Sequence, residues 1–217
     1  VKYGPDLRRE LVDQALFQFS ETARAAQQSF SRALKQRNAC LRQIKEGLID
    51  PNRGRAILDS LNLGYIDSAT QLTFERLHFL RSLTPYIQNA LSEIMGTKTS
   101  LYVLYESAEK EWDQTEKQAV FERIQDETND STRRIAEEAL GQTLTGPHRH
   151  DLSFIFNGND SRIFCSQGQQ RALILGFKIA EIVYHSEVFE SYPLLLLDDV
   201  LSEFDESKRR FLIDFLK

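Results

Sequence analysis

The chain has 217 residues, of which 41% are hydrophobic and 27% are charged, so it has the composition of a globular protein with one large or two modest domains. Its formal net charge of −5 argues against a surface coated evenly with DNA-binding charge, and no apolar run is long enough to cross a membrane. Because its two cysteines, Cys40 and Cys165, are far apart, we expect neither a disulfide framework nor a structural zinc site, and reduced thiols fit a cytoplasmic protein.

Residues 6–48 are predicted to form one helix or two nearly continuous helices. Two series with heptad spacing run through them: Leu16, Ala23, Phe30 and Ile44, with Arg37 as a polar exception, and Phe19, Ala26, Ala33 and Cys40. This spacing places both series along one seam, where the alanines let a partner helix approach closely. Gly47 and the sequence Pro51-Asn52-Arg53-Gly54 mark the end of the helix.

Basic residues are concentrated in the same stretch, which contains few acids before Glu46 and Asp50. Two interpretations remain open. The basic residues either form an ordinary solvated helix face or contact DNA phosphates, for which the candidates are Arg32, Lys35, Arg37 and Arg42.

Further helices are expected at residues 68–95 and 117–140. The first has a stripe of leucine and isoleucine, and Pro85 inside it should kink or split it. We expect it to pack antiparallel to the first helix as a protruding arm. Residues 100–105 and 151–156 have the β-branched, aromatic and alternating patterns of strands, and Gly158 follows the second in a turn.

A short polar segment, Ser166-Gln167-Gly168-Gln169-Gln170, opens an apolar helix that extends to about residue 183. Ser166 is a good N-cap, and the free N–H groups of a first helical turn favour an anion. Gly168 would let a ligand approach the backbone closely. These residues alone leave two interpretations open, a phosphate site or a serine N-cap without a ligand.

A buried strand is predicted at residues 192–197, and it ends in two carboxylates, Asp198 and Asp199. Ligands of open α/β sheets bind beyond the carboxyl ends of the strands. Asp198 is therefore placed to hold Mg²⁺, and Asp199 could orient or deprotonate a water molecule. The alternative is an acidic pair that caps the following helix.

The order of these segments, followed by Ser202-Glu203-Phe204-Asp205, resembles the signature motif, Walker B strand and D-loop of ABC-type ATPases. Upstream, Thr145-Gly146-Pro147-His148-Arg149 resembles the Gly-Pro-His-Arg segment of the RecF family, and segments near residues 8–13 and 34–39 also resemble that family. The resemblance covers most of the chain and is weakest between about residues 52 and 134.

The resemblance implies an ATP-dependent DNA-binding protein of recombinational repair, the SOS response and replication restart, which acts with RecO and RecR at gapped DNA and holds ATP between two protomers. Ser166, Gln167, Gly168 and Gln169 would address the γ-phosphate of ATP bound to the other subunit. Asp198 would support Mg²⁺ and Asp199 would be the catalytic residue. Ser202 and Asp205 would lie at the interface of the dimer.

Two positions depart from the family pattern. Cys165 replaces a leucine before the signature serine, which should alter packing only. His150 replaces an aspartate, so no role is assigned to that position. A metal site from His148, His150 and Asp151 is conceivable, but it lacks a fourth ligand.

No Gly-x-x-x-x-Gly-Lys-Ser/Thr loop occurs in the chain, which is therefore expected to be a fragment that does not hydrolyse ATP alone, whereas the full-length protein would be a weak DNA-stimulated ATPase. We expect a mixed, helix-rich α/β fold. Residues 1–142 would form a mainly helical arm domain, from which the strand near residues 100–105 could join the ATPase sheet, and residues 143–217 would be the carboxy-terminal part of an ABC-type ATPase head. The alternatives are an SMC-like or Rad50-like head fragment, which the short helical insertion disfavours, and a non-enzymatic helical scaffold.

Overall fold

The structure, a computed structural model, describes residues 4–107, 110–113, 115–193 and 215. Two compact units are present. We call residues 1–9, 79–105 and 152–217 the sheet unit, and residues 10–78 and 106–151 the helical unit. The chain passes between the units four times, and the domain boundary expected at residue 142 stays a prediction.

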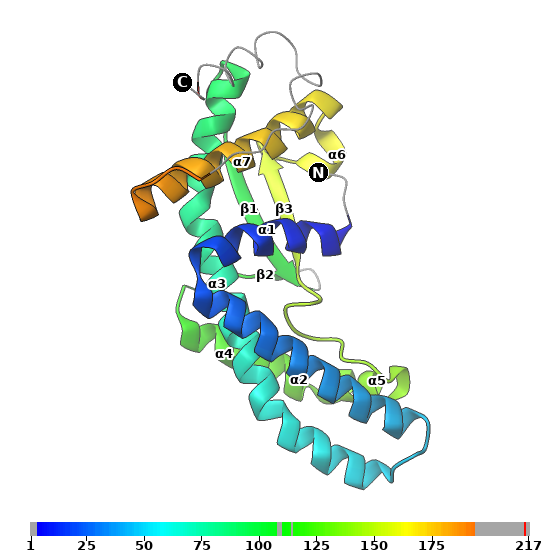
Figure 1. Cartoon of the computed structure of the whole chain (residues 1–217). Helices are drawn as coiled ribbons and strands as arrows, with labels where there is room; N and C mark the ends of the chain where they lie inside the picture. The colour runs from blue at the N-terminus through cyan, green and yellow to red at the C-terminus, as the bar shows by residue number, and fades with distance from the viewer. Residues whose placement is uncertain (1–3, 108–109, 114, 194–214, 216–217) are drawn as a thin grey trace. The chain divides into compact units, whose positions relative to one another are not determined.

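Helices dominate the described residues, and four strands form one sheet, which confirms the mixed, helix-rich class (Figure 1). Strand β2 pairs antiparallel with β1, β4 pairs antiparallel with β3, and the order across the sheet is β2-β1-β3-β4. The elements are α1 (Pro5–Phe19), α2 (Glu21–Lys45), α3 (Pro51–Met95), β1 (Leu101–Ser107), β2 (Lys110–Glu111), α4 (Lys117–Asn129), α5 (Ser131–Leu140), β3 (Asp151–Phe156), β4 (Asn159–Asp160), α6 (Ser161–Phe164) and α7 (Gln167–Phe189).

The first predicted helix is two helices, because Ser20 interrupts it. Ser20 has an extended backbone, and its hydroxyl accepts a hydrogen bond from the Ala23 N–H, so that it caps α2. The heptad seam is confirmed, since Ala23, Ala26, Phe30 and Cys40 are buried. Seven-residue spacing therefore identified the buried face of α2 correctly.

Helix α3 begins at Pro51, well before the predicted start at residue 68. The Asp50 carboxylate accepts a hydrogen bond from the Arg53 N–H at 3.0 Å, and Pro51 occupies the first helical position, where its missing N–H costs nothing. Pro85 was expected to kink or split this helix, and the split is not observed, because α3 continues through Pro85. Pro85 is exposed, and buried Leu83 and Ile87 on either side hold the helix in place.

Helices α2 and α3 form an antiparallel hairpin within the helical unit. Near the start of α2, Ser20 donates to Glu75 at 3.0 Å, whereas near its end the Cys40 thiol lies 3.5 Å from the Gly54 carbonyl oxygen. Residues later in α2 contact residues earlier in α3, which is the pattern of an antiparallel pair. Gly54 is needed there, because a Cβ atom would lie 2.4 Å from Ile44 Cγ1.

The third predicted helical stretch is also divided. Asp130 ends α4 and caps α5, since its carboxylate accepts a hydrogen bond from the Arg133 N–H at 2.8 Å. In the sheet unit, the core forms where α7 packs on strand β3. The rings of Phe154 and Phe177 meet edge to face with centroids 6.4 Å apart.

Candidate nucleotide and nucleic-acid sites

The amino terminus of α7 is closed by a reciprocal pair of hydrogen bonds. The Ser166 hydroxyl accepts from the Gln169 N–H at 3.3 Å, and the Gln169 side-chain oxygen accepts from the Ser166 N–H at 2.8 Å. This capping box holds the predicted signature residues in one fixed turn. The hydroxyl proton of Ser166 stays available to a ligand, because the hydroxyl acts only as an acceptor in the cap.

The surface around this turn is open. Ser166, Gln167 and Gly168 are exposed. Gly168 has space around it, because a Cβ atom added there would lie 4.0 Å from the Ser166 hydroxyl oxygen, which is ordinary contact distance. The N–H groups of Gln167 and Gly168 belong to the first turn, where the helix itself offers them no acceptor. Hydroxyl and backbone donors at the positive end of a helix fit a phosphate group chemically.

Sequence reasoning missed two residues that fix the chain before the cap. Asp160 caps α6 by accepting from the Arg162 N–H at 2.8 Å, and the guanidinium of Arg162 keeps the pKa of the Asp160 carboxyl below its ordinary value. Gln170 donates its amide to the Cys165 carbonyl at 3.1 Å. An aspartate directly before Ser161 was a visible N-cap signal, whereas the contact of Gln170 required coordinates.

The remaining nucleotide-site predictions, Asp198, Asp199, Ser202 and Asp205, lie outside the described residues. The role of each therefore stays a prediction. Among the residues that the structure does describe, no group of three or more histidine, cysteine or carboxylate side chains could hold a metal ion. The rings of His148 and His150 instead pack on Phe30 and Trp112, with centroids 5.7 and 4.6 Å apart.

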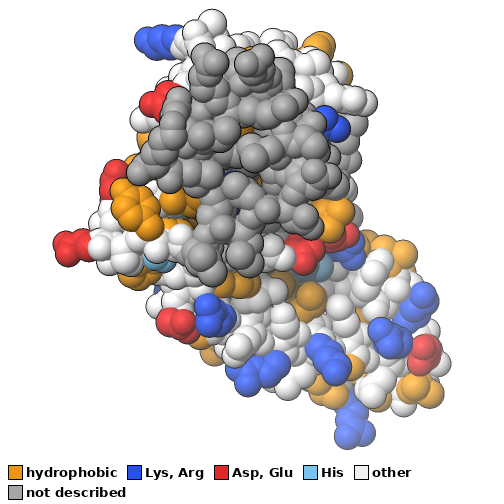
Figure 2. All heavy atoms as spheres, turned by 45° about the horizontal axis from the view of Figure 1, so that its top comes forward, with side chains coloured by type: hydrophobic (Ala, Val, Ile, Leu, Met, Phe, Trp, Pro, Cys, Tyr) orange, Lys and Arg blue, Asp and Glu red, His pale blue; other side chains and the backbone are white. Residues whose placement is uncertain are grey.

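Three of the four predicted DNA-contact residues lie on the exposed side of α2. Arg32, Lys35 and Arg42 are exposed, and residues 22–45 contain no acidic side chain. Arg24, Lys35 and Arg42 are 11 and 7 residues apart, which at about 3.6 residues per turn places them on one line opposite the buried seam. Figure 2 shows Lys and Arg side chains spread over the helical part of the molecule with few acids among them.

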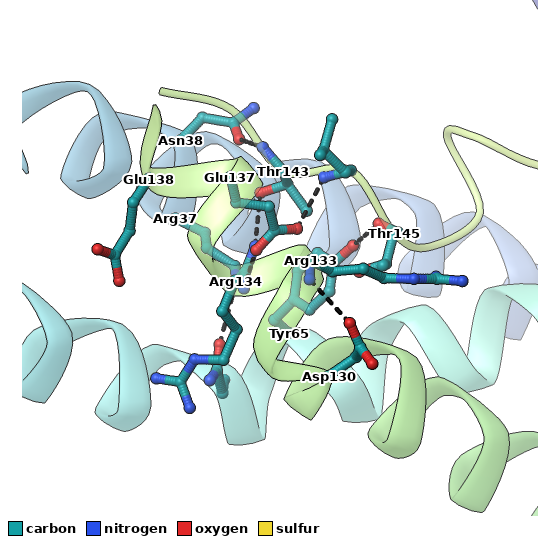
Figure 3. Close-up of polar contacts among 12 residues, drawn as sticks. Arg37, Asn38, Tyr65, Asp130, Arg133, Arg134, Glu137, Glu138, Thr143 and Thr145 are labelled. Carbon is teal, nitrogen blue, oxygen red and sulfur yellow. Dashed lines mark hydrogen bonds and ion pairs between the residues drawn. The ribbon is translucent and has the colours of Figure 1, made fainter. Parts of the chain in front are cut away.

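The prediction for Arg37 is wrong. Its side chain is 1% exposed and forms an ion pair with Glu137 at 2.8 Å (Figure 3). It also donates to Asn62 at 3.0 Å and to Thr143 at 2.9 Å. Arg37 occupies its place in the buried heptad series, so its guanidinium cannot reach a DNA phosphate.

The wider network around Arg37 joins α2, α3 and α5. Tyr65 of α3 lies under the Arg37 guanidinium, 5.2 Å from its carbon to the ring centroid, and burial raises the pKa of the Tyr65 hydroxyl far above its ordinary value. A neutral phenol in this place can donate its proton to a carbonyl. The network is thus buried and joins three helices of the helical unit.

No helix in the described ranges has the length and apolar character needed to span a bilayer. No family model matches the chain. It does match curated relatives along its whole length. It is 34% identical over 217 residues to the DNA replication and repair protein RecF of Staphylococcus carnosus, covering 100% of this chain and 57% of that relative. The RecF of Microcystis aeruginosa is 34% identical over 221 residues, with 58% of it covered.

Solved structures agree with these relatives. The structure described as the recombination mediator protein RecF with ATPrS in the RecFOR pathway matches with a TM-score of 0.86 and 25% identity, covering 100% of this chain and 56% of that one. The corresponding RecF–ATP structure matches with a TM-score of 0.85 and 27% identity. The chain thus spans little more than half the length of the proteins it matches. Over that entire span, it is homologous to part of the DNA replication and repair protein RecF.

Proposed function

We propose that the chain is part of an ATP-dependent DNA-binding protein of recombinational repair and replication restart, in which ATP closes a dimer. The observation that carries this proposal is the match of all 217 residues to RecF proteins, including solved structures named for bound ATP and ATPrS. The open, capped amino terminus of α7 and the acid-free face of α2 supply the two kinds of surface that such a protein needs.

In the nucleotide site, Ser166, Gln167, Gly168 and Gln169 would donate to the γ-phosphate of ATP held by a second protomer. ATP would supply the phosphoanhydride, and these residues would hold the oxygens of its γ-phosphate. Asp198 would support Mg²⁺, Asp199 would orient the attacking water, and Ser202 with Asp205 would meet the second protomer. The exposed apolar side chains of Ile163 and Phe164, 73% and 66% exposed, stand directly before the cap and suit burial against another chain.

In the DNA site, Arg32, Lys35 and Arg42 would contact phosphates. From Arg24 to Lys45 the basic face of α2 is about 32 Å long at about 1.5 Å per residue, close to one turn of duplex DNA. Its cations would give an affinity that falls as salt rises, because phosphate contacts release counterions. We propose gapped DNA, RecO and RecR as its partners, and the RecFOR pathway for which the matched structures are named supports the two proteins.

The test uses a chimera in which the aligned part of Staphylococcus carnosus RecF is replaced by this chain. Sedimentation with and without Mg-ATP measures association. We expect an ATP-dependent dimer, lost on Ser166→Arg because the arginine fills the space for the phosphate. The control is Val188→Arg, which introduces the same side chain at the exposed far end of α7.

Association of the Ser166→Arg chimera equal to that of the unmodified chimera would refute the signature role. A folded chimera that binds no ATP and does not dimerise would instead favour the non-enzymatic scaffold.

A further inference from the structure

Residues 143–150, which we call the clamped loop, follow α5 and carry Arg149, to which no role has been given so far. Side chains from several helices hold the backbone of this loop. The Tyr65 hydroxyl donates to the Thr145 carbonyl, and Arg76 donates to the Pro147 carbonyl at 2.9 Å. Arg76 is itself fixed by two hydrogen bonds of 2.7 Å to the Asp13 carboxylate. Most residues of this loop are buried, and a loop held by buried charged side chains cannot move freely.

The start of the clamped loop is held as firmly. The Asn38 side-chain oxygen accepts from the Thr143 N–H at 2.7 Å, and Glu137 accepts from the Leu144 N–H at 2.7 Å while it pairs with Arg37 (Figure 3). The buried ion pair therefore has a second task besides stability, which is to fix the backbone at the start of the loop.

Gly146 shows how closely the clamped loop fits. Its φ angle is +104°, a conformation that disfavours any side chain, and a Cβ atom would lie 2.2 Å from the Tyr65 hydroxyl oxygen. The Arg149 N–H closes the turn by donating to the Gly146 carbonyl at 2.8 Å. Only glycine lets the loop approach α3 in this way.

The turn delivers an exposed cation beside α2. The Arg149 guanidinium donates to the Thr143 carbonyl at 3.2 Å, and Thr143 is in turn bonded to Asn38 of α2. On the surface of a helix, residues three and four positions apart are neighbours, so Asn38 lies next to both Lys35 and Arg42. Within the described part of the chain, neither of these two residues forms an ion pair.

We propose that Arg149 is a phosphate-contacting residue of the DNA-binding surface, held beside Lys35 and Arg42 by the clamped loop. The ligand is the phosphodiester backbone of a nucleic acid. A planar guanidinium on a fixed turn suits this task, because it can meet two phosphate oxygens with little loss of side-chain freedom. The inference rests on the proposed DNA-binding function and deepens it.

Arg37 and Glu137 act through the loop and are positioning residues. They touch no phosphate, but they hold the backbone to which Arg149 is bonded. An account in which they serve stability alone predicts no change in the salt dependence of DNA binding for any variant that stays folded.

The experiment measures duplex binding to the whole chain by fluorescence anisotropy over a series of salt concentrations. Arg149→Ala should weaken binding about fivefold and flatten the slope of log K against log salt by about 0.9, the loss of one phosphate contact. Arg55→Ala is the control, since it removes the same charge from a guanidinium already paired with Glu138. It should leave the slope unchanged.

A second variant tests whether the position of Arg149, and not only its charge, is needed for DNA binding. Gly146→Ala keeps Arg149 but displaces the loop, so it should flatten the slope by a similar amount, whereas Gly64→Ala, placed where a Cβ atom meets no neighbour, should not. Circular dichroism confirms that each variant is folded. A competition in which inorganic phosphate or ATP at matched ionic strength displaces the duplex would identify a small-anion site and overturn the proposal.

The measurements distinguish failure of the role given to Arg149 from failure of the proposed DNA-binding function. If Lys35→Ala and Arg42→Ala weaken binding while Arg149→Ala behaves like Arg55→Ala, the role of Arg149 is refuted and the DNA-binding face of α2 stands. If the folded chain binds no duplex even at low salt, the DNA-binding proposal fails, and the role of Arg149 fails with it.

Discussion

Different kinds of interaction stabilise the interior of each unit. In the helical unit, two buried ion pairs join residues far apart in the chain: Arg37 with Glu137, and Arg76 with Asp13. In the sheet unit, the ion pairs recorded among the described residues join neighbours such as Asp160 and Arg162. Its distant residues are joined by apolar packing, as between Phe154 and Phe177, and by hydrogen bonds that are not ion pairs, as between Tyr86 and Glu187. Buried ion pairs fix a loop in the helical unit, whereas close packing fixes α7 in the sheet unit.

This difference has a consequence for substitution. A buried charge that loses its partner cannot return to water, so the helical unit should tolerate the loss of one partner badly. The energy of apolar packing changes gradually with the volume of the side chain, so the stability of the sheet unit should depend on side-chain size.

The largest effect is expected for Glu137→Ala, which leaves Arg37 buried without its carboxylate. We predict a loss of about 3–5 kcal/mol in the free energy of unfolding. Trp112 is the one tryptophan in the chain, and its exposed fraction is 2%. Its fluorescence therefore reports unfolding of the helical unit. The control Glu138→Ala breaks the pair with Arg55, whose side chain is 50% exposed, and should cost much less than Glu137→Ala. Equal losses in the two variants would contradict the special place given to the buried pair.

In the sheet unit, Gly176→Ala should destabilise the protein by about 1–3 kcal/mol, because the new Cβ atom would lie 2.9 Å from Leu91 Cγ. Gly64→Ala changes a helical glycine with open space around it and should stabilise the protein by about 0.5–1 kcal/mol. Thermal unfolding of both variants checks the two signs. Stabilisation of both would show that Leu91 moves aside and that packing there is loose.

Ser166→Ala should cost about 1 kcal/mol, since it removes the acceptor for the Gln169 N–H at the start of α7. Hydrogen exchange should speed up in the first turn of α7 and stay unchanged in α2. Ser166→Thr keeps a hydroxyl at this position and should retain most of the protection. Unaltered exchange after Ser166→Ala would mean that the capping box does not hold this turn.

The smallest effect concerns pH. Burial raises the pKa of the Glu181 carboxyl above its ordinary value of 4.5, while its bond to Lys178 opposes the shift. The folded protein therefore binds this proton more tightly than the unfolded chain, and stability falls as pH rises from 4.5 through the raised pKa. Glu181→Gln should remove this fall, which denaturation measured across this pH range would show. A parallel pH dependence in the two proteins would exclude this carboxyl as its source.

Periodicity and capping signals predicted much of the fold. The heptad series located the buried face of α2, and Ser166 was predicted correctly as the N-cap of α7. The start of α3 was also encoded locally, by Asp50 before Pro51, although the prediction placed it later. These features depend on residues that are close in sequence, which is why they can be recognised without coordinates.

Arg37 shows where such reasoning stops. Its position in the heptad series indicated burial, while its charge suggested a surface contact. The deciding partner, Glu137, lies 100 residues away, and no local pattern connects the two. The same holds for Arg149, whose place beside α2 depends on Tyr65, Arg76 and Asn38.

The central claim is that nucleotide and DNA are held by different regions of the chain. The most direct test compares two variants of the chimera. The first carries Ser166→Arg, and the second carries both Lys35→Ala and Arg42→Ala. Sedimentation with Mg-ATP and duplex binding without nucleotide are measured for each. We predict that the first variant loses ATP-dependent association and keeps nucleotide-free DNA binding, and that the second does the reverse. If each variant lost both properties while staying folded, or if neither lost any, the account would be contradicted.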